Sequence, residues 1–410
     1  MKRACLTIAF AVMASVALSA YDNDGPNYRP SALKSARLMA TSDSFKPPEA
    51  SDICFVATSG GDLGKEVWGK DSSNTPKGSI SIPLPINRYF GDKAKLLQSK
   101  ALPETVTLKM VVWDVDDKST YTPAEYDEIF VNGNAPRDKK ALYGVNDGLH
   151  MDTFTIDTKH IKLPENPGET AINTIRIDVA TKGGDWVTRI DWVALEIPAA
   201  PPVVLAHGIN SNKSTMQDHI GTLIKEKLGL PVYSLEWPNH GNNHIFDYER
   251  LVKYIDAYKK VCKVDHVNIV AHSMGGLRAR GYTENAKDVL RVLQLGSPNG
   301  GSPFANYLTD DIDRKLAAIE AANASEAIKD MNRKAVQDEW GRLASYFGQD
   351  LDPYHDAAIR CLRTDFMEDY NTHHHLNPLV DYSVLAGRVT KGGGDLAKWE
   401  YNISRYGNNH

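Results

Sequence analysis

Between residues 200 and 300, short apolar runs alternate with polar stretches that include a segment of helical spacing. Four runs are expected to be strands: 201–210, 230–238, 267–270 and 289–295. Residues 248–261 place Leu251, Ile255 and Tyr258 on one helical face. Strands that alternate with helices predict a doubly wound, mostly parallel sheet covered by helices on both faces, so we expect an α/β fold.

The chain before residue 198 has a different pattern, in which short β-rich runs are separated by Gly, Pro, Asn and Asp. This pattern predicts an all-β, jelly-roll-like sandwich over residues 50–197. A stiff proline-bearing linker at 198–202 would join it to an α/β domain at 203–410. The runs expected to be strands of the sandwich include 106–113, 128–132, 152–156, 172–179 and 190–197.

Two groups of residues in the predicted sandwich suggest ligands. The acidic residues are Asp114, Asp116, Asp117, Asp127 and Glu128, and the tryptophans are Trp113, Trp186 and Trp192. The acidic group matches no defined calcium loop, so a solvated acidic loop is favoured over a metal site. The tryptophans either bind a glycan or polymer or fill the sandwich core, and the core is favoured.

The N-terminal residues predict the cellular localisation of the protein. Lys2 and Arg3 precede an apolar run at 4–16 and small residues at 17–20, a pattern typical of a secretory signal peptide over residues 1–20. We therefore expect a secreted protein, with the polar segment 21–49 disordered or loosely attached. No other segment has the ~20 apolar residues that a membrane span requires.

Composition adds two further expectations. The formal net charge of −5 and the absence of basic runs argue against a nucleic-acid partner. Cys54, Cys262 and Cys361 follow the predicted signal peptide. Either Cys262 and Cys361 form a disulfide or all three are free thiols.

Ser273 lies in the segment AHSMGG, 271–276, between an expected strand and an expected helix. Ala271 and Gly275 are small enough to let the strand and the helix approach closely. Such a strand–turn–helix junction holds its serine in a strained conformation with the hydroxyl exposed, so Ser273 is a candidate nucleophile. The upstream strand ends in His207 and Gly208, a turn that predicts an oxyanion hole made by the backbone N–H groups of Ile209 and Met274.

Residues from about 200 to 390 resemble the bacterial lipases and esterases of the α/β-hydrolase fold. The resemblance rests on segments 205–209, 232–238, 268–276, 296–302 and 382–387. It implies hydrolysis of carboxylic esters through an acyl-enzyme on Ser273, with no cofactor and no metal. It also implies that a helical cap covers the site, and the amphipathic residues at about 311–371 fit such a cap.

The cap has two interpretations. It is either a lid that opens over an apolar pocket or a rigid helical extension whose apolar face is core. Asp310, Asp311 and Asp313 are expected to be helix N-terminal charges before residues 314–322, which is favoured over a role as the catalytic acid.

The serine needs a histidine as base and a carboxylate to orient that histidine, in the chain order serine, acid, histidine. After the late strand at 382–387, the candidates are Asp395 and His410, with Glu400 a weaker acid. Alternatively, the true acid and histidine lie beyond residue 410.

The other histidines are assigned other roles. His373, His374 and His375 are expected in a polar surface loop, with too few ligands for a metal site. His240 and His244 are expected to rim the pocket, and His272 is expected to be a packing or hydrogen-bonding residue.

The sequence therefore predicts a secreted serine hydrolase, a lipase or carboxylesterase, that acts on a small-molecule or lipid ester. A glycan or polymer is a possible partner of the sandwich. Two alternatives stay open: a non-catalytic glycan- or lipid-binding protein with a degenerate hydrolase domain, and an acyltransferase or amidase that uses the same serine.

Overall fold

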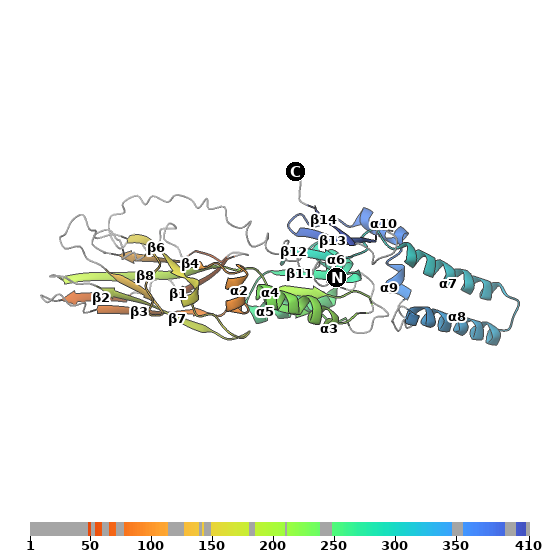
Figure 1. Ribbon diagram of the computed structural model, residues 1–410, viewed down its shortest axis with the longest axis horizontal. Helices are drawn as coiled ribbons and strands as arrows, with labels where there is room; N and C mark the ends of the chain where they lie inside the picture. The colour runs from red at the N-terminus through yellow and green to blue at the C-terminus, as the bar shows by residue number, and fades with distance from the viewer. Residues whose placement is uncertain are drawn as a thin grey trace. The chain divides into compact units, whose positions relative to one another are not determined.

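The computed structural model describes most of the chain beyond residue 47. The described residues are 48–50, 54–59, 65–70, 78–113, 127–138, 142, 149–179, 185–209, 211–237, 248–346, 356–389 and 399–406. They form two compact units that divide after Pro201, with Lys225–Pro231 and Val261–Lys263 grouped with the first (Figure 1). The predicted signal peptide, residues 1–20, and nearly all of segment 21–49 lie outside the described residues.

The first unit is built mainly of antiparallel strands. Its elements are β1 (Cys54–Ser59), β2 (Lys65–Lys70), β3 (Gly78–Ile86), α2 (Lys93–Gln98), β4 (Thr105–Trp113), β5 (Glu128–Val131), β6 (Leu149–Asp157), a 3₁₀ turn (Thr158–His160), β7 (Ala171–Val179) and β8 (Asp185–Pro198). One sheet has the order β1-β8-β4-β6, with β2 also paired to β8, and the other has the order β3-β7-β5. The packing of these sheets as a jelly-roll-like sandwich, and the domain boundaries at 197 and 203, stay predictions.

The ligand candidates of this unit are only partly described. Trp192 is 1% exposed and belongs to the core, as favoured from the sequence. Asp114, Asp116 and Asp117 lie outside the described residues, and nothing is described of the side chains of Trp113 and Trp186. Asp127 has no exposed surface, so the expectation of a solvated acidic loop was wrong for this residue, which is buried beside β5. A glycan or polymer partner of this unit stays an untested possibility.

The chain from Val203 onward forms a six-stranded sheet with helices, which shows the predicted α/β fold. Its elements are β9 (Val203–Ala206), α3 (Lys213–Met216), a π-helical turn (Gln217–Gly221), α4 (Thr222–Leu228), β10 (Val232–Ser234), α5 (Glu249–Cys262), β11 (Val267–His272), α6 (Met274–Thr283), β12 (Val289–Leu295), α7 (Pro303–Ala321), α8 (Glu326–Tyr346), α9 (Asp356–Arg360), α10 (Thr364–His373), β13 (Asp381–Val389) and β14 (Trp399–Tyr406). The strand order is β10-β9-β11-β12-β13-β14. Five strands are parallel, and β14 runs antiparallel to β13.

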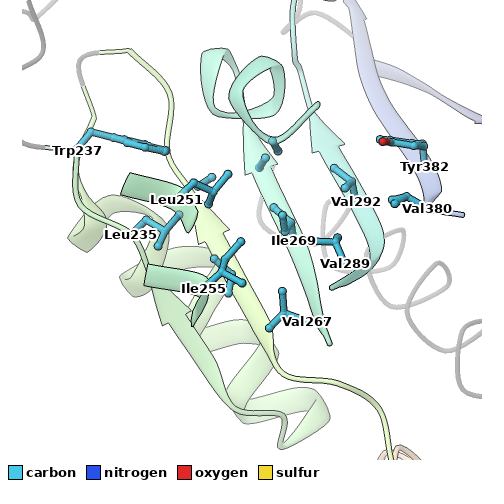
Figure 2. Packing of buried hydrophobic residues seen from close by; sticks show 14 residues of the cluster. Leu235, Trp237, Leu251, Ile255, Val267, Ile269, Val289, Val292, Val380 and Tyr382 are labelled. Carbon is cyan, nitrogen blue, oxygen red and sulfur yellow. The ribbon is translucent and has the colours of Figure 1, made fainter. Parts of the chain in front are cut away.

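The core of this sheet explains why its strands are apolar runs. All four residues of β9 are buried, as expected for a strand covered on both faces. Leu251 and Ile255 of α5 pack in one cluster with Ile269 of β11 and Tyr382 of β13 (Figure 2). The carboxyl ends of the parallel strands β9, β11 and β12 are thereby fixed side by side, at the edge where such sheets carry their sites.

Four helices, α7 to α10, follow β12, where the sequence predicted a cap at about 311–371. The first of them begins earlier, at Pro303, so Asp310, Asp311 and Asp313 lie inside α7. The expectation that they are helix N-terminal charges was wrong, because Pro303 at the first position starts the helix upstream of them. Figure 1 shows α7 and α8 as a hairpin, and ion pairs such as Lys315 to Glu339 join the two helices.

Two other expectations can be compared with the structure. Cys54, Cys262 and Cys361 are free, which agrees with the alternative of free thiols rather than a disulfide. Among the described helices, none combines the length and the apolar character needed to cross a membrane.

Candidate active site

Ser273 lies at the junction of β11 and α6, in an unusual backbone conformation. Its φ of +52° and ψ of −128° lie in a region that non-glycine residues avoid, at a cost of about 1–3 kcal/mol. Ser273 occupies the N-cap position of α6, where serine normally accepts a hydrogen bond from the first turn, yet its side chain makes no such bond. The hydroxyl of this half-buried residue is therefore not used for capping.

Close packing around the junction holds this conformation. A Cβ atom on Gly275 would lie 2.5 Å from the carbonyl oxygens of both Ala206 and His207, so α6 fits against β9 only without a side chain there. On the other side, the Ser273 N–H donates to the Leu295 carbonyl at 3.0 Å. The serine is thus fixed between the ends of β9 and β12.

The loop after β9 lies directly against Ser273. A Cβ on Gly208 would lie 2.6 Å from Ser273 Cβ and 3.2 Å from Ser273 Oγ. Ile209 follows in the loop, and Met274 begins α6, whose first N–H groups have no partner within the helix. The two candidate oxyanion residues, Ile209 and Met274, therefore lie in the two chain segments next to Ser273.

His207 is buried, with 1% of its surface exposed, and both of its ring nitrogens have partners. Nδ1 lies 2.9 Å from the Gly208 carbonyl oxygen, and the Trp237 N–H donates to Nε2 at 3.3 Å. A carboxylate oxygen of Glu236 also lies 3.5 Å from Nε2. With both nitrogens engaged by other groups, His207 is not available as a base for Ser273.

Three further histidines singled out from the sequence have other surroundings. His272 is exposed, although partial burial of its ring lowers its pKa below the usual value. His373 is the last residue of α10, and His374 Nδ1 lies 2.8 Å from Glu284 Oε2. The prediction of a surface loop for these histidines was wrong for His373, because the helix continues through it.

The predicted acid and base, Asp395 and His410, lie outside the described residues, as do His240 and His244. Among the described residues, no imidazole forms a hydrogen bond with Ser273 Oγ. The strand register relates β13 and β14 to the position of Ser273. Leu385 of β13 pairs with Leu295, and β13 continues to Val389 at the same edge of the sheet as Ser273. β14 runs back along β13 and ends at Tyr406, opposite Tyr382 near the amino end of β13, so it ends at the sheet edge away from Ser273, and His410 as the base stays a prediction from chain order alone.

A chain of hydrogen bonds that the sequence did not predict supports the first turn of α6. Gln294 Nε2 donates to the Gly276 carbonyl at 2.8 Å, and Asn299 Nδ2 donates to Gln294 Oε1 at 2.8 Å. Asn371 Nδ2 donates to the Asn299 carbonyl at 2.9 Å. Arg280 then donates to Asn371 Oδ1 at 2.6 Å. A polar Gln294 near the end of the largely apolar β12 was the available sequence signal.

No group of His, Cys, Asp and Glu side chains that could hold a metal ion occurs within the described ranges.

Comparisons with known proteins give one family match. Residues 202–378 match the family model described as palmitoyl protein thioesterase, a segment that contains Ser273, the loop after β9 and helices α7 to α10. The match covers less than half of the chain and supports a hydrolase. A search of curated proteins found no match.

Several solved structures are similar over part of the chain. The mature lipase BlEst2 of Bacillus licheniformis is 23% identical over 48% of this chain and 69% of its own, with a TM-score of 0.34. Lipase 1 of Pelosinus fermentans is 17% identical over 45% and 67%, with a TM-score of 0.26. A metagenomic carboxyl esterase is 14% identical over 45% and 49%, with a TM-score of 0.29, so this chain spans about half of its length.

Proposed function

We propose that this protein hydrolyses acyl esters through an acyl-enzyme on Ser273, with carboxylic esters and acyl thioesters as its substrate classes. The observation that carries the proposal is the backbone of Ser273: a serine at the start of a helix, held at φ +52°, whose hydroxyl does not cap that helix. Maintaining a strained serine requires compensating packing, and such strain is concentrated at functional sites. The thioester class comes from the family match.

The reaction would proceed in two halves. Ser273 Oγ attacks the acyl carbonyl carbon while its proton passes to a histidine, for which His410 is the candidate, with Asp395 as its orienting acid. The tetrahedral intermediate collapses, the C–O or C–S bond breaks, and the alcohol or thiol leaves with the proton. Water then attacks the acyl-enzyme by the same route in reverse and releases the carboxylic acid.

The negative charge of each tetrahedral intermediate would be stabilised by backbone donors. The N–H groups of Ile209 and Met274 are the proposed donors, and the positive end of the α6 dipole adds to the Met274 side. Loss of one such donor typically costs about 3–4 kcal/mol of transition-state stabilisation. The signal-peptide pattern at residues 1–20 supports the further proposal that the enzyme is secreted.

The first test is Ser273→Ala, assayed on p-nitrophenyl esters of short and long acyl chains and on a palmitoyl thioester. Turnover should fall by about 10⁴-fold or more, as when the nucleophile of a serine hydrolase is removed. A fluorophosphonate probe should label wild type and not Ser273→Ala. His410→Ala and Asp395→Asn, in the same assay, test the proposed base and acid.

Ser302→Ala is a matched control, because Ser302 is also a helix N-cap whose side chain makes no capping bond, at the start of α7. It should keep wild-type turnover and labelling. Equal labelling of wild type and Ser273→Ala, or no turnover of either ester class by folded wild type, contradicts the proposal. Transfer of the acyl group to an added alcohol in place of water would instead identify an acyltransferase.

A further inference from the structure

We infer that His207 is a positioning residue that aims the Ile209 N–H into the proposed oxyanion hole. This inference rests on the proposed function and names a residue that acts through the backbone and not on the substrate. The geometry that carries it is the contact of 2.9 Å between His207 Nδ1 and the carbonyl oxygen of Gly208.

The protonation of His207 follows from its second partner. Two groups lie near Nε2: the Trp237 N–H at 3.3 Å and a Glu236 carboxylate oxygen at 3.5 Å. The shorter contact, with a donor, assigns a lone pair to Nε2. The ring proton of the neutral imidazole is then on Nδ1, and Nδ1–H donates to the Gly208 carbonyl. Trp237 is itself 1% exposed, with the Arg278 guanidinium 4.5 Å from its ring centroid, so the group that fixes the tautomer is held in place.

The Gly208 carbonyl and the Ile209 N–H belong to one planar peptide unit, in which the two groups point in opposite directions. Fixing the carbonyl oxygen therefore fixes the direction of the N–H. Among the described residues, no backbone group forms a hydrogen bond with either end of this peptide. Within the described part of the chain, the contact with the imidazole is therefore the restraint on this peptide.

The same peptide is placed correctly to act on Ser273. Gly208 packs against the Ser273 side chain, as the 3.2 Å approach of a Gly208 Cβ to Ser273 Oγ shows. The Ile209 side chain packs on the apolar cluster that contains Met274, the proposed second donor. His207 and the Ile209 side chain thus hold the two ends of the peptide that carries the N–H.

Two substitutions separate this role from simple packing. In His207→Asn, the side-chain amide can place an N–H near the position of Nδ1 and keep the donor to Gly208. In His207→Gln, the amide reaches the position of Nε2, keeps a partner for Trp237 and loses the donor to Gly208. Glutamine is closer to histidine in volume, so a role in packing alone predicts that His207→Gln is the milder change.

Two measurements on the full chain test the inference. Hydrogen exchange of the backbone amides at 208–209, followed by mass spectrometry, should be faster in His207→Gln than in wild type and unchanged in His207→Asn. Because an oxyanion donor acts in the transition state, kcat of His207→Gln should fall with little change in KM. The expected loss of kcat is at least about 10-fold. It should not exceed the loss on removing an oxyanion donor altogether, which is about 100- to 1000-fold. His207→Asn should retain most of the wild-type kcat.

The outcomes distinguish the inference from the proposed function. Equal exchange in His207→Gln and wild type, or a larger loss of kcat in His207→Asn than in His207→Gln, overturns the positioning role. Absence of Ser273-dependent turnover in wild type overturns the proposed function instead. The exchange comparison still decides in that case whether His207 holds the Gly208–Ile209 peptide.

Discussion

Helices α9 and α10 pack against the helix that follows Ser273, whereas α8 and the distal half of α7 form a hairpin held mainly by charged pairs. In the first region, Met367 and Tyr370 of α10 are buried in one cluster with Met274 and Leu277 of α6. In the second, Met331 is 65% exposed on α8. Both regions are amphipathic helices of the predicted cap, but only the first shares a core with the site.

Their polar contacts differ in the same way. Arg280 of α6 is 9% exposed and donates to Asn371 Oδ1 and to the His374 carbonyl of the α10 region. On the hairpin, Arg333 pairs with Glu320, Glu326 and Asp330, whose side chains are more than half exposed. The contacts place α9 and α10 in one core with α6. Of the two interpretations of the cap, a lid therefore stays a prediction that concerns the α7–α8 hairpin, and the rigid extension fits α9 and α10.

The largest expected difference between the regions comes from a matched pair of methionine truncations. Met367 has no exposed surface, so Met367→Ala removes buried methylene groups and leaves a cavity, which costs about 2–5 kcal/mol. Met331→Ala, on the hairpin, should stay within about 0.5 kcal/mol of wild type. Urea unfolding followed by circular dichroism measures both. Similar losses in the two variants would show that the hairpin is packed as tightly as α10.

A matched pair of arginine substitutions should show a smaller difference in the free energy of unfolding between the two regions. Arg280→Met removes donors to two acceptors in a poorly hydrated region, which should cost about 1–3 kcal/mol. Arg333→Met breaks exposed ion pairs, which are worth about 0–1 kcal/mol. The same unfolding assay applies, with the Arg333 effect shrinking further in high salt because exposed charges are screened. A greater loss for Arg333→Met than for Arg280→Met would reverse the assignment of core and periphery.

This division could not be predicted from the sequence, although the helices could. Spacing indicates which residues share a helical face, and Met367 and Met331 both lie on such faces. Whether a face meets α6 or solvent depends on contacts between segments about 90 residues apart, such as Arg280 with Asn371. The start of α7 was misplaced for a local reason: the acidic residues Asp310, Asp311 and Asp313 suggested a helix N-terminus, whereas Pro303 marks the first turn of the helix.

The parallel strands and the Ser273 junction were predictable because each depends on local chemistry. Apolar runs of four to seven residues match β9, β11 and β12, and small residues flank Ser273 where β11 meets α6. β3 was not among the strands named in advance, because Pro83 and Pro85 interrupt its sequence. Among the described strands it pairs with β7 and lies at the edge of its sheet, which is where prolines are tolerated. Its buried residues alternate with exposed ones, as in an ordinary strand.

The roles of His207 and Gln294 could not be assigned from the sequence either. Both depend on a partner from another strand end, Trp237 in one case and Asn299 in the other. A His-Gly pair at the end of a strand indicated that the loop matters, but it did not indicate which imidazole nitrogen carries the proton.

The smallest expected effect is a pH dependence that separates the two regions. Partial burial by itself would raise the pKa of Glu284, but hydrogen bonds from His374 and from the His375 N–H outweigh it and hold the pKa below its usual value. A carboxyl group with a lowered folded-state pKa stabilises the fold above its unfolded pKa, and this contribution is lost as the pH falls through the folded-state pKa. Lowering the pH from neutral to below about 4 should therefore destabilise wild type more than Glu284→Gln, by less than about 1 kcal/mol.

Asp311 of the hairpin is the control for this pH dependence, since hydrogen bonds from Lys315 and Arg314 also lower its pKa and both partners are charged side chains of the same helix, Arg314 being 77% exposed. Salt at about 0.5 M should remove most of the difference between wild type and Asp311→Asn and leave more of the difference for Glu284→Gln, because Glu284 also accepts a hydrogen bond from the His375 backbone N–H, which salt screens less than a pair of exposed charges. Thermal unfolding across pH at low and high salt measures both differences. If salt removes the Glu284 difference as completely as the Asp311 difference, the His374 contact is a surface pair, and α10 is attached to α6 by its apolar cluster and Arg280 alone.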